Sequence, residues 1–344
     1  MGNISVLDAV VGQLRAVPPV VNVDLKDKVI IVIGANAGLG FEATKHFARM
    51  GAEKVILACR SKEKGDAAVH QLEEEIGCHN VERWSIDLSS FDSVRAFADR
   101  AIKELGRIDV LLFNAAILPS PGGKYEATSD NYEIALQVNV LSQSLLGLLL
   151  VPKIIETSKK HSTAPRIVVV TSEMHFLTSF EDNVMDAANT FETFGSPEFC
   201  TPKKMKVRYQ DTKLLNVFFV RALSERLKNQ SVIVNCVNPG FCYSEIRRNV
   251  TTLATRVLEW VFARSTEQGS RQLVYGAIGG ANDQELENLK GAYINIARVD
   301  EPSDFVLGED GKKREGKLWN DLVHVLVKVD SRVKDVVKEY LASV

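Results

Sequence analysis

The chain lacks several features that mark specialised classes of protein. Its five cysteines include no C-x-x-C pair, and its six histidines show no spacing typical of metal ligands, so neither a disulfide framework nor a metal site is expected. The 42 basic and 44 acidic side chains nearly cancel, which leaves no basic footprint for a nucleic acid. These absences favour an intracellular protein whose thiols are reduced.

Long hydrophobic runs and targeting signals are also missing. The longest apolar stretch, LLGLLLV at 145–151, is too short to span a bilayer. The start has no basic segment followed by an apolar core, and Val6 stands where a myristoylation motif needs Ser or Thr. We therefore expect a soluble, cytoplasmic protein, for which membrane contact is not favoured.

What the sequence does have is a regular series of short apolar runs separated by segments with helical periodicity. Most runs are continuous rather than alternating, as expected for strands covered on both faces. This alternation predicts one α/β domain over 24–344, a Rossmann-type, doubly wound parallel sheet of about seven strands with helices on both faces. The runs lie at 28–34, 53–59, 81–87, 107–114, 166–171, 231–238 and 291–297.

Several segments stand outside this alternation. We expect an N-terminal extension over 1–23, an insert over 173–205, a lid at about 241–265 and a C-terminal helical extension over 317–344. Both terminal segments carry apolar residues at helical spacing. Packing against the body or a second subunit is favoured for them over membrane contact.

A glycine turn follows the first predicted strand. VIGANAGLG at 32–40 places Gly34, Gly38 and Gly40 between this strand and a helical segment. Such a turn lets the backbone approach a pyrophosphate, which the N-terminus of the next helix then binds. A tight strand–helix connection without a ligand is the alternative.

The second strand should end beside the adenosine ribose. Arg60 stands there in place of an acidic residue, and Lys62 and Lys64 follow it. An acid would accept from the 2′-hydroxyl of NAD, whereas a guanidinium pairs with the 2′-phosphate of NADP. Unless Arg60 is only a solvated surface residue, the pattern predicts NADP(H).

A tyrosine and a lysine form a second constellation downstream. YQDTK places Tyr209 and Lys213 four residues apart, on one face of a helix. A phenol serves as acid and base near neutral pH only when its phenolate is stabilised, as a neighbouring ammonium would do. Ser172 ends the fifth strand, at the sheet edge where open α/β folds bind ligands.

In these motifs the chain resembles the short-chain dehydrogenase/reductase family, from about Asp24 to Trp319. The retinol dehydrogenase and WW-domain oxidoreductase branch is most similar, through GAYI, LW and ACR. The resemblance implies the catalytic tetrad Asn139, Ser172, Tyr209 and Lys213. It also implies a cofactor site formed by Gly34, Asn36, Gly38, Leu39, Gly40, Arg60, Lys64, Asp87, Leu88, Asn114, Ala115, Ala116, Asn139, Tyr209, Lys213, Pro239, Gly240 and Ser244.

The family pattern assigns a role to each catalytic residue. Tyr209 would act as general acid in reduction and base in oxidation, Lys213 would bind the nicotinamide ribose, and Ser172 would hydrogen-bond the substrate oxygen. Asn139, through a water inside its helix, would connect the lysine to solvent. The chain departs from the family at several cofactor-side positions, which puts the exact cofactor geometry in doubt: Ile33, Ala37, Phe113, Ala116 and Ser244.

The substrate is expected to be a hydrophobic or aromatic aldehyde or ketone. The lid segment is rich in apolar residues, although an ordinary packed helix would look similar. Glu173, His175 and Phe176 follow the serine and either line the pocket or only stabilise the insert. Two other functions stay open, non-redox chemistry at the same site and a cofactor-sensing scaffold. A homodimer or homotetramer through the long Asn139 helix is a family expectation.

Overall fold

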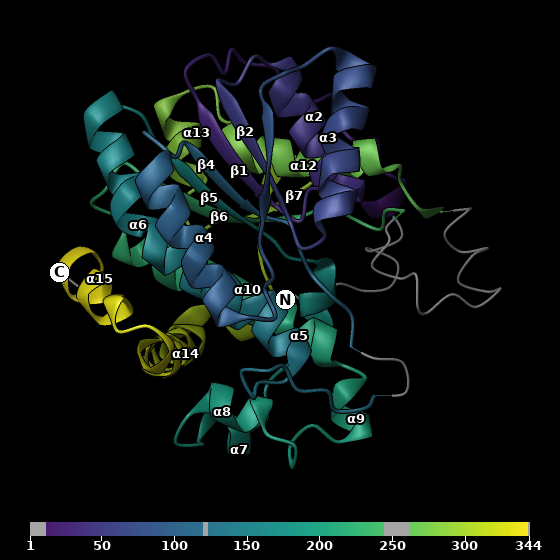
Figure 1. Cartoon of the computed structure of the whole chain (residues 1–344). Coiled ribbons are helices and arrows are strands. Elements are labelled where there is room, and N and C mark those ends of the chain that lie inside the picture. The colour runs from purple at the N-terminus through teal and green to yellow at the C-terminus, as the bar shows by residue number, and fades with distance from the viewer. Residues whose placement is uncertain (1–11, 120–122, 244–261, 343–344) are drawn as a thin grey trace.

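The structure is a computed structural model and describes residues 12–119, 123–243 and 262–342. Its centre is one eight-stranded sheet in the order β3-β2-β1-β4-β5-β6-β7-β8 (Figure 1). Neighbouring strands from β3 to β7 are parallel, and β8 is antiparallel to β7. The strands are β1 (Val29–Ile33), β2 (Lys54–Cys59), β3 (Val81–Ser85), β4 (Val110–Phe113), β5 (Arg166–Val170), β6 (Ile233–Asn238), β7 (Tyr293–Asn295) and β8 (Arg298–Asp300).

Helices cover both faces of the sheet, and each face has its own hydrophobic core. Successive residues of β1 alternate between the two cores, with Ile31 in one and Ile30 and Val32 in the other. All five residues of β1 are therefore buried, which explains its continuous apolar run. One core contains α2 (Gly38–Arg49), α3 (Lys62–Ile76) and α12 (Thr266–Ile278); the other contains α4 (Phe91–Glu104), α6 (Ser142–His161) and α10 (Arg208–Arg226).

The central strands create the crevice in which open α/β sheets bind ligands. β1 lies between β2 and β4, with Ile33 paired to Ala58 on one side and to Phe113 on the other. The strand order reverses at this point, and the carboxyl ends of β1 and β4 flank the reversal. The doubly wound α/β fold expected from the sequence is confirmed.

One long apolar helix crosses the core. It comprises α5 (Ile134–Leu136), the π-helical turn η1 (Gln137–Leu141) and α6. By length and composition it could cross a membrane, but 94% of its most apolar window is buried inside the molecule. It packs against α4 and the C-terminal helix α15 (Arg332–Tyr340), as the core helix of a soluble protein does.

Several elements of the fold were predicted only in part or not at all from the sequence. The insert contains the 3₁₀ helix η2 (Glu173–Leu177), α7 (Asp182–Met185), α8 (Thr190–Gly195) and α9 (Pro202–Met205), and α13 (Asp283–Asn288) precedes β7. Helix α14 (Gly308–Val329) begins nine residues before the predicted start at 317, because its first turns are polar and carry no apolar stripe. The short strand β8 was not expected. Most of the predicted lid (residues 244–261) and the first eleven residues of the predicted N-terminal extension lie outside the described residues.

Candidate active site

The glycine turn follows β1 directly. Gly34 has a φ of +85°, and its amide donates to the Ala58 carbonyl across 2.8 Å. A Cβ at Gly34 would come within 2.7 Å of Ala115, and a Cβ at Gly40 within 2.3 Å of the Gly34 carbonyl oxygen. Neither position can take a side chain, so the turn is held tightly between β2, β4 and helix α2.

The start of α2 has the geometry of an anion site. A Cβ built on Gly38, the first residue of the helix, would meet no atom within 4 Å, so there is open space in front of it. The N-cap residue Ala37 provides no side-chain hydrogen bond to the first turn. A helix N-terminus that no side chain caps, beside a residue with open space around it, fits the pyrophosphate of a dinucleotide.

The carboxyl end of β4 supports this turn. The Asn114 side chain donates from Nδ2 to the Gly34 carbonyl across 2.6 Å. Gln143, on α6, donates from Nε2 to the Ala115 carbonyl across 2.7 Å. The predicted cofactor residues Asn114 and Ala115 therefore adjoin the glycine turn, and Gln143 is a supporting residue that the sequence analysis missed.

The loop after β2 contains an exposed arginine. Arg60 follows β2, and no carboxylate among the described residues lies within ion-pair distance of it. Ser61 caps α3 by accepting from the Lys64 amide across 3.2 Å, which fixes the main chain beside Arg60. The guanidinium is thus accessible to an anion near the carboxyl edge of the sheet.

The turn after β3 is fixed by short polar side chains. Asp87 accepts at Oδ1 from both the amide and the hydroxyl of Ser89, at 2.9 and 2.6 Å. Leu88 is buried, and its carbonyl accepts from the Ser142 hydroxyl of α6 across 2.6 Å. Both predicted residues therefore lie in a rigid turn at the same sheet edge as the glycines.

Tyr209 and Lys213 lie one turn apart on α10, next to the end of β5. The Lys213 ammonium nitrogen is 5.4 Å from the centre of the Tyr209 ring and donates to the Val170 carbonyl across 2.7 Å. Its side chain is buried, which lowers the pKa of Lys213 to about 7. The Thr171 hydroxyl donates to the Lys213 carbonyl across 2.9 Å, so β5 and α10 are joined where Ser172 begins the next loop.

Asn139 occupies the π-helical turn η1 and is fully buried. Its Oδ1 accepts from the Ile117 amide, and its Nδ2 donates to the Ile117 carbonyl, both across 2.9 Å. Nδ2 also lies 3.2 Å from the hydroxyl of Thr212, which itself donates to the Tyr209 carbonyl. Its side chain therefore connects the loop after β4 to the helix that carries Tyr209.

Of the three residues after Ser172 that could line a pocket or stabilise the insert, His175 has a structural role. His175 is fully buried; its Nδ1 donates to the Ser172 carbonyl across 2.7 Å, and its Nε2 accepts from the Ser303 amide across 3.1 Å. Burial lowers the pKa of His175 to about 4, so the ring is neutral. His175 therefore stabilises the loop, whereas Glu173 and Phe176 are only partly buried.

Two charged residues that the sequence analysis missed anchor the insert to α10. Arg208, next to Tyr209, is buried beside Glu133, with 3.5 Å between Nε and Oε2, and donates to the Phe194 carbonyl across 2.6 Å. Asp211 accepts from the Thr178 hydroxyl across 2.6 Å, and burial raises the pKa of Asp211 to about 6. The sequence signal that could have revealed these two residues is the presence of charged side chains among the apolar residues of α10.

The loop after β6 completes the crevice. Gly240 has a φ of +78°, and its amide donates to Asn238 Oδ1 across 3.2 Å. Asn238 in turn donates to Asn295 of β7 across 3.2 Å. Pro239 is buried beneath this turn. The predicted cofactor residue Ser244 lies outside the described residues.

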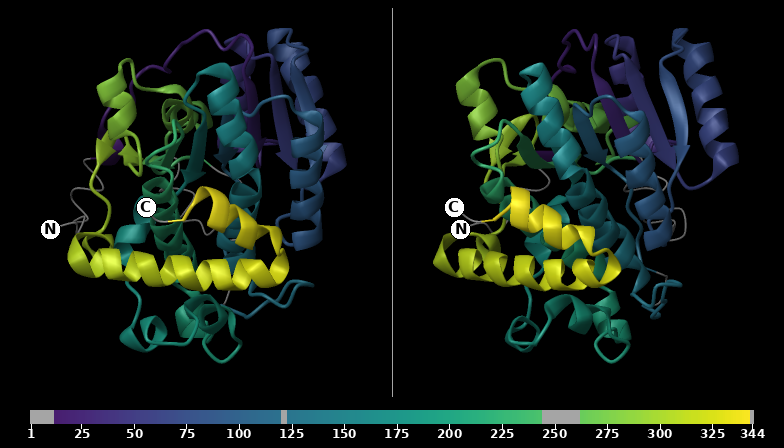
Figure 2. Two further views of the ribbon diagram at one scale, coloured as in Figure 1. Left: turned by 90° about the vertical axis from the view of Figure 1, so that its left-hand side faces the viewer. Right: turned by 60° about the vertical axis from the view of Figure 1, so that its left-hand side comes forward.

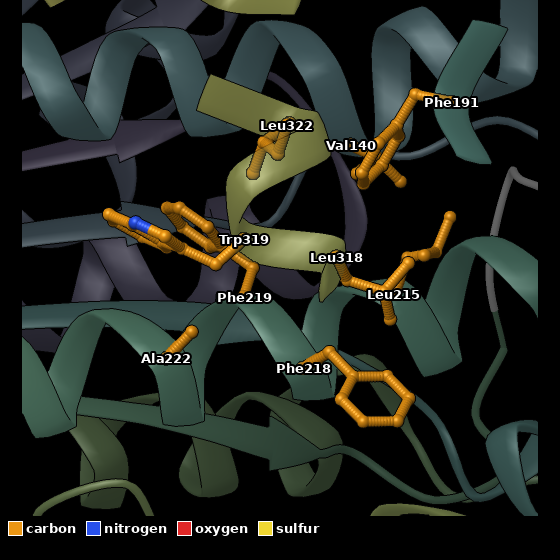
Figure 3. Close-up of a pocket in the computed structure, with 9 residues that line it drawn as sticks. All are labelled: Val140, Phe191, Leu215, Phe218, Phe219, Ala222, Leu318, Trp319 and Leu322. Atoms are coloured by element: carbon orange, nitrogen blue, oxygen red, sulfur yellow. The ribbon is translucent and has the colours of Figure 1, made fainter. Parts of the chain in front are cut away.

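A separate cavity between α10 and α14 is too small to bind a substrate. It has a volume of about 10 Å³, about the space for one water molecule. In Figure 3, side chains from α10 and α14 approach one another across it, and all of its lining is apolar. The lining residues are Val140, Phe191, Leu215, Phe218, Phe219, Ala222, Leu318, Trp319 and Leu322.

Known proteins are similar to this chain in sequence and in fold. The family model for short chain dehydrogenases matches residues 28–185. A short chain dehydrogenase/reductase of Cryptosporiopsis sp. is 36% identical, over 87% of this chain and 90% of the relative. A WW domain-containing oxidoreductase of Gallus gallus is 37% identical, over 79% of this chain and 62% of that protein.

Solved structures agree in fold at lower identity. A short-chain dehydrogenase/reductase from Brucella melitensis superposes with a TM-score of 0.59 at 18% identity, over 80% of this chain and 96% of the other. A short chain dehydrogenase from Shigella flexneri 2a, solved in complex with NADP, gives a TM-score of 0.55 at 20% identity, over 80% of this chain and 99% of the other.

Proposed function

The chain belongs to the short-chain dehydrogenase/reductase family of oxidoreductases, and on this basis we propose that it uses NADP(H) to interconvert a carbonyl and an alcohol on a hydrophobic or aromatic small molecule. One observation carries the proposal. A lysine that is buried in the core lies behind a tyrosine at the carboxyl edge of the sheet, with 5.4 Å between the Lys213 nitrogen and the ring centre. Burying a lysine is costly, and such groups gather at functional sites.

The cofactor would lie along the carboxyl edge of the strands. Its pyrophosphate would bind the turn from Gly34 to Gly40, including Asn36 and Leu39, where the open space at Gly38 supports the fit. Arg60, with Lys64 nearby, would pair with the 2′-phosphate of NADP. The remaining contacts would come from Asp87, Leu88, Asn114, Ala115, Ala116, Asn139, Tyr209, Lys213, Pro239, Gly240 and Ser244.

The nicotinamide supplies or accepts the hydride, and the side chains handle the proton. Ser172 would donate a hydrogen bond to the substrate oxygen, on which negative charge develops during reduction. Tyr209 would give its proton to that oxygen, and in oxidation it would take the proton back. The Lys213 ammonium would stabilise the tyrosinate left behind.

A proton path would then restore Tyr209. The amide of Asn139 is already bonded to Ile117 and Thr212. The expected link between Lys213 and solvent would therefore use the main chain of the π-helical turn η1 rather than this side chain. Such turns are frequent at functional sites.

An apolar substrate is supported by the side chains that follow the serine. Met174 and Phe176 are partly buried, and Leu177 is 61% exposed. Exposed large apolar side chains beside a reaction centre fit an apolar ligand. We further propose a cytoplasmic location, which is supported by five cysteines that form no disulfide in the described part of the chain.

The test is NADPH consumption with a panel of apolar aldehydes and ketones. The wild-type enzyme should oxidise NADPH in the presence of some of them, and Tyr209→Phe should lose this turnover while still binding NADPH. Turnover that persists in Tyr209→Phe would refute the role of the phenol. Tight NADPH binding without any reduction would instead favour non-redox chemistry or a sensing role.

A further inference from the structure

The N-terminal segment 12–15, which we call the N-terminal clasp, is bound to the loop that follows β6. The Gln13 side chain donates from Nε2 to the carbonyls of Phe241 and Phe262, across 2.8 and 2.7 Å. Its Oε1 accepts from the Phe241 amide across 3.0 Å. One amide side chain thus holds main-chain groups of two segments that lie more than 200 positions away in the sequence.

The two segments held by Gln13 are also paired with each other. Cys242 and Arg264 form a parallel bridge, in which the Arg264 amide donates to the Phe241 carbonyl across 2.9 Å. The Arg264 side chain is buried and also contacts the clasp. Its Nη2 donates to three clasp carbonyls, those of Gly12 at 2.9 Å and of Gln13 and Arg15 at 3.2 Å.

The clasp packs against the Pro239–Gly240 turn. A Cβ on Gly240 would lie 2.6 Å from Arg264 Nη1 and 3.2 Å from Gln13 Oε1. The missing side chain at Gly240 is therefore what allows Gln13 and Arg264 to approach the turn. A displacement of the clasp would therefore also displace the main chain from Gly240 to Cys242.

The chain that follows the clasp contacts α12. The Pro18 carbonyl accepts from Arg271 across 3.2 Å, and Arg271 pairs with Glu267 across 2.7 Å. Glu267 in turn lies 3.2 Å from His46 of α2, the helix that begins at the glycine turn. The N-terminal segment from Gly12 to Pro18 therefore contacts both the loop after β6 and helix α12.

We infer that Gln13 is a positioning residue of the active site, which holds the Phe241 main chain and the Pro239–Gly240 turn where the nicotinamide and the substrate carbonyl must meet. The inference rests on the proposed function, in which this turn flanks the nicotinamide. On this view, the N-terminal extension is part of the active site and does not merely pack against it.

The test compares full-length Gln13→Ala with a matched control, Gln284→Ala. Gln284 is an exposed residue of α13, so the control makes the same change away from the site. Gln13→Ala should lower kcat/KM for a carbonyl substrate about tenfold, the effect of one well-placed hydrogen bond. Its NADPH dissociation constant and melting temperature should match those of the control. Hydrogen exchange at the Phe241 amide should become faster in Gln13→Ala alone.

A second variant separates positioning from general packing. In Gln13→Glu, the protonated acid keeps one donor and one acceptor, whereas the carboxylate offers only acceptors to two carbonyl oxygens. The Arg264 guanidinium beside Gln13 favours the carboxylate, so kcat/KM of Gln13→Glu should fall at least as far as that of Gln13→Ala, although the side chain keeps its size.

The inference is overturned if Gln13→Ala matches Gln284→Ala in both kcat/KM and Phe241 amide exchange. It is also overturned if Gln13→Glu, which keeps the size of the side chain but loses its donor, retains the kcat/KM of the wild type. A wild-type enzyme that binds NADPH but reduces no carbonyl would contradict the proposed function instead. In that case the exchange rate at Phe241 decides alone: faster exchange in Gln13→Ala supports the clasp, and unchanged exchange refutes it.

Discussion

Lys213 is the residue whose environment is hardest to explain by packing alone. Its nitrogen has one described hydrogen-bond acceptor, the Val170 carbonyl, and its side chain is 1% exposed. Burial lowers the pKa of Lys213 to about 7, although the nearby Cys236 thiol acts in the opposite direction. A buried cation with so little compensation is destabilising, which supports a role in proton transfer beside Tyr209.

The pH dependence of catalysis should follow from this pKa. In the free enzyme, Lys213 is an ammonium below pH about 7 and loses its proton above it. We expect kcat/KM for NADPH in the reductive direction to fall about tenfold for each pH unit above that point. In Lys213→Arg the positive charge persists, so the residual activity should not titrate there. A wild-type profile that is flat up to pH about 9 would contradict this role of the lysine.

Cofactor preference should depend on Arg60. Replacing it in Arg60→Asp removes the partner of a 2′-phosphate and adds an acceptor for a 2′-hydroxyl. We expect the ratio of kcat/KM for NADPH to that for NADH to fall at least tenfold. Lys62→Asp, which also introduces a negative charge beside α3, should change this ratio much less. Equal changes of this ratio in Arg60→Asp and Lys62→Asp would indicate a general electrostatic effect and not a specific contact of Arg60.

At the scale of elements, the loop after β5 joins Ser172, the proposed partner of the substrate oxygen, to the C-terminal part of the chain. His175 of η2 connects the Ser172 carbonyl to the Ser303 amide, and its ring packs on Phe176 and Tyr293, with 4.0 and 4.9 Å between ring centres. The neutral ring can make both hydrogen bonds, whereas a protonated ring would point a donor at the Ser303 amide. Acid should therefore weaken this junction.

Stability should reflect this histidine. The pKa of His175 is about 4 in the folded protein and near 6.5 in the unfolded chain, so between these values the unfolded chain binds the proton more tightly. The contribution of His175 is complete above pH 6.5 and declines by about 3 kcal/mol as the pH falls to 4. In His175→Gln, which cannot titrate, the free energy of unfolding should fall less over this range. Parallel curves for the two proteins would contradict the assignment.

The sequence predicted the elements that local patterns define and missed those that depend on distant partners. Tyr209 and Lys213 were recognisable because four residues separate them on one helix, and their catalytic roles remain predictions. β8 (Arg298–Asp300) was missed because it contains one apolar residue and therefore no apolar run. Gln13 and Arg264 carry no local motif, and their contacts became visible only when the fold brought the two ends of the chain together.

At the scale of the whole molecule, the C-terminal helices cover surfaces through which a second subunit was expected to bind. α15 packs across α6, the helix that follows Asn139, and α14 crosses α10 (Figure 2). The side chains Val333 of α15 and Leu318 of α14 are buried there. Arg95 and Asp99 of α4 bind Val329 and Arg332, which fixes this cover in place.

We therefore expect a monomer. An association through the long Asn139 helix would require α15 to leave a face that its buried valines occupy, at a cost of roughly 1.5–3 kcal/mol for each such side chain. Light scattering at micromolar concentration should give a mass near 38.0 kDa. A mass twice as large that reverts on substitution of an α6 residue would contradict the expectation.

Hydride transfer to the substrate is the claim on which the proposed function depends, and isotope labelling tests it most directly. The enzyme is incubated with an aldehyde that it consumes and with NADPH carrying deuterium at both C4 positions of the nicotinamide, and the product is analysed by mass spectrometry. We predict an alcohol with one deuterium on the former carbonyl carbon. A product formed without deuterium would show that the site performs different chemistry.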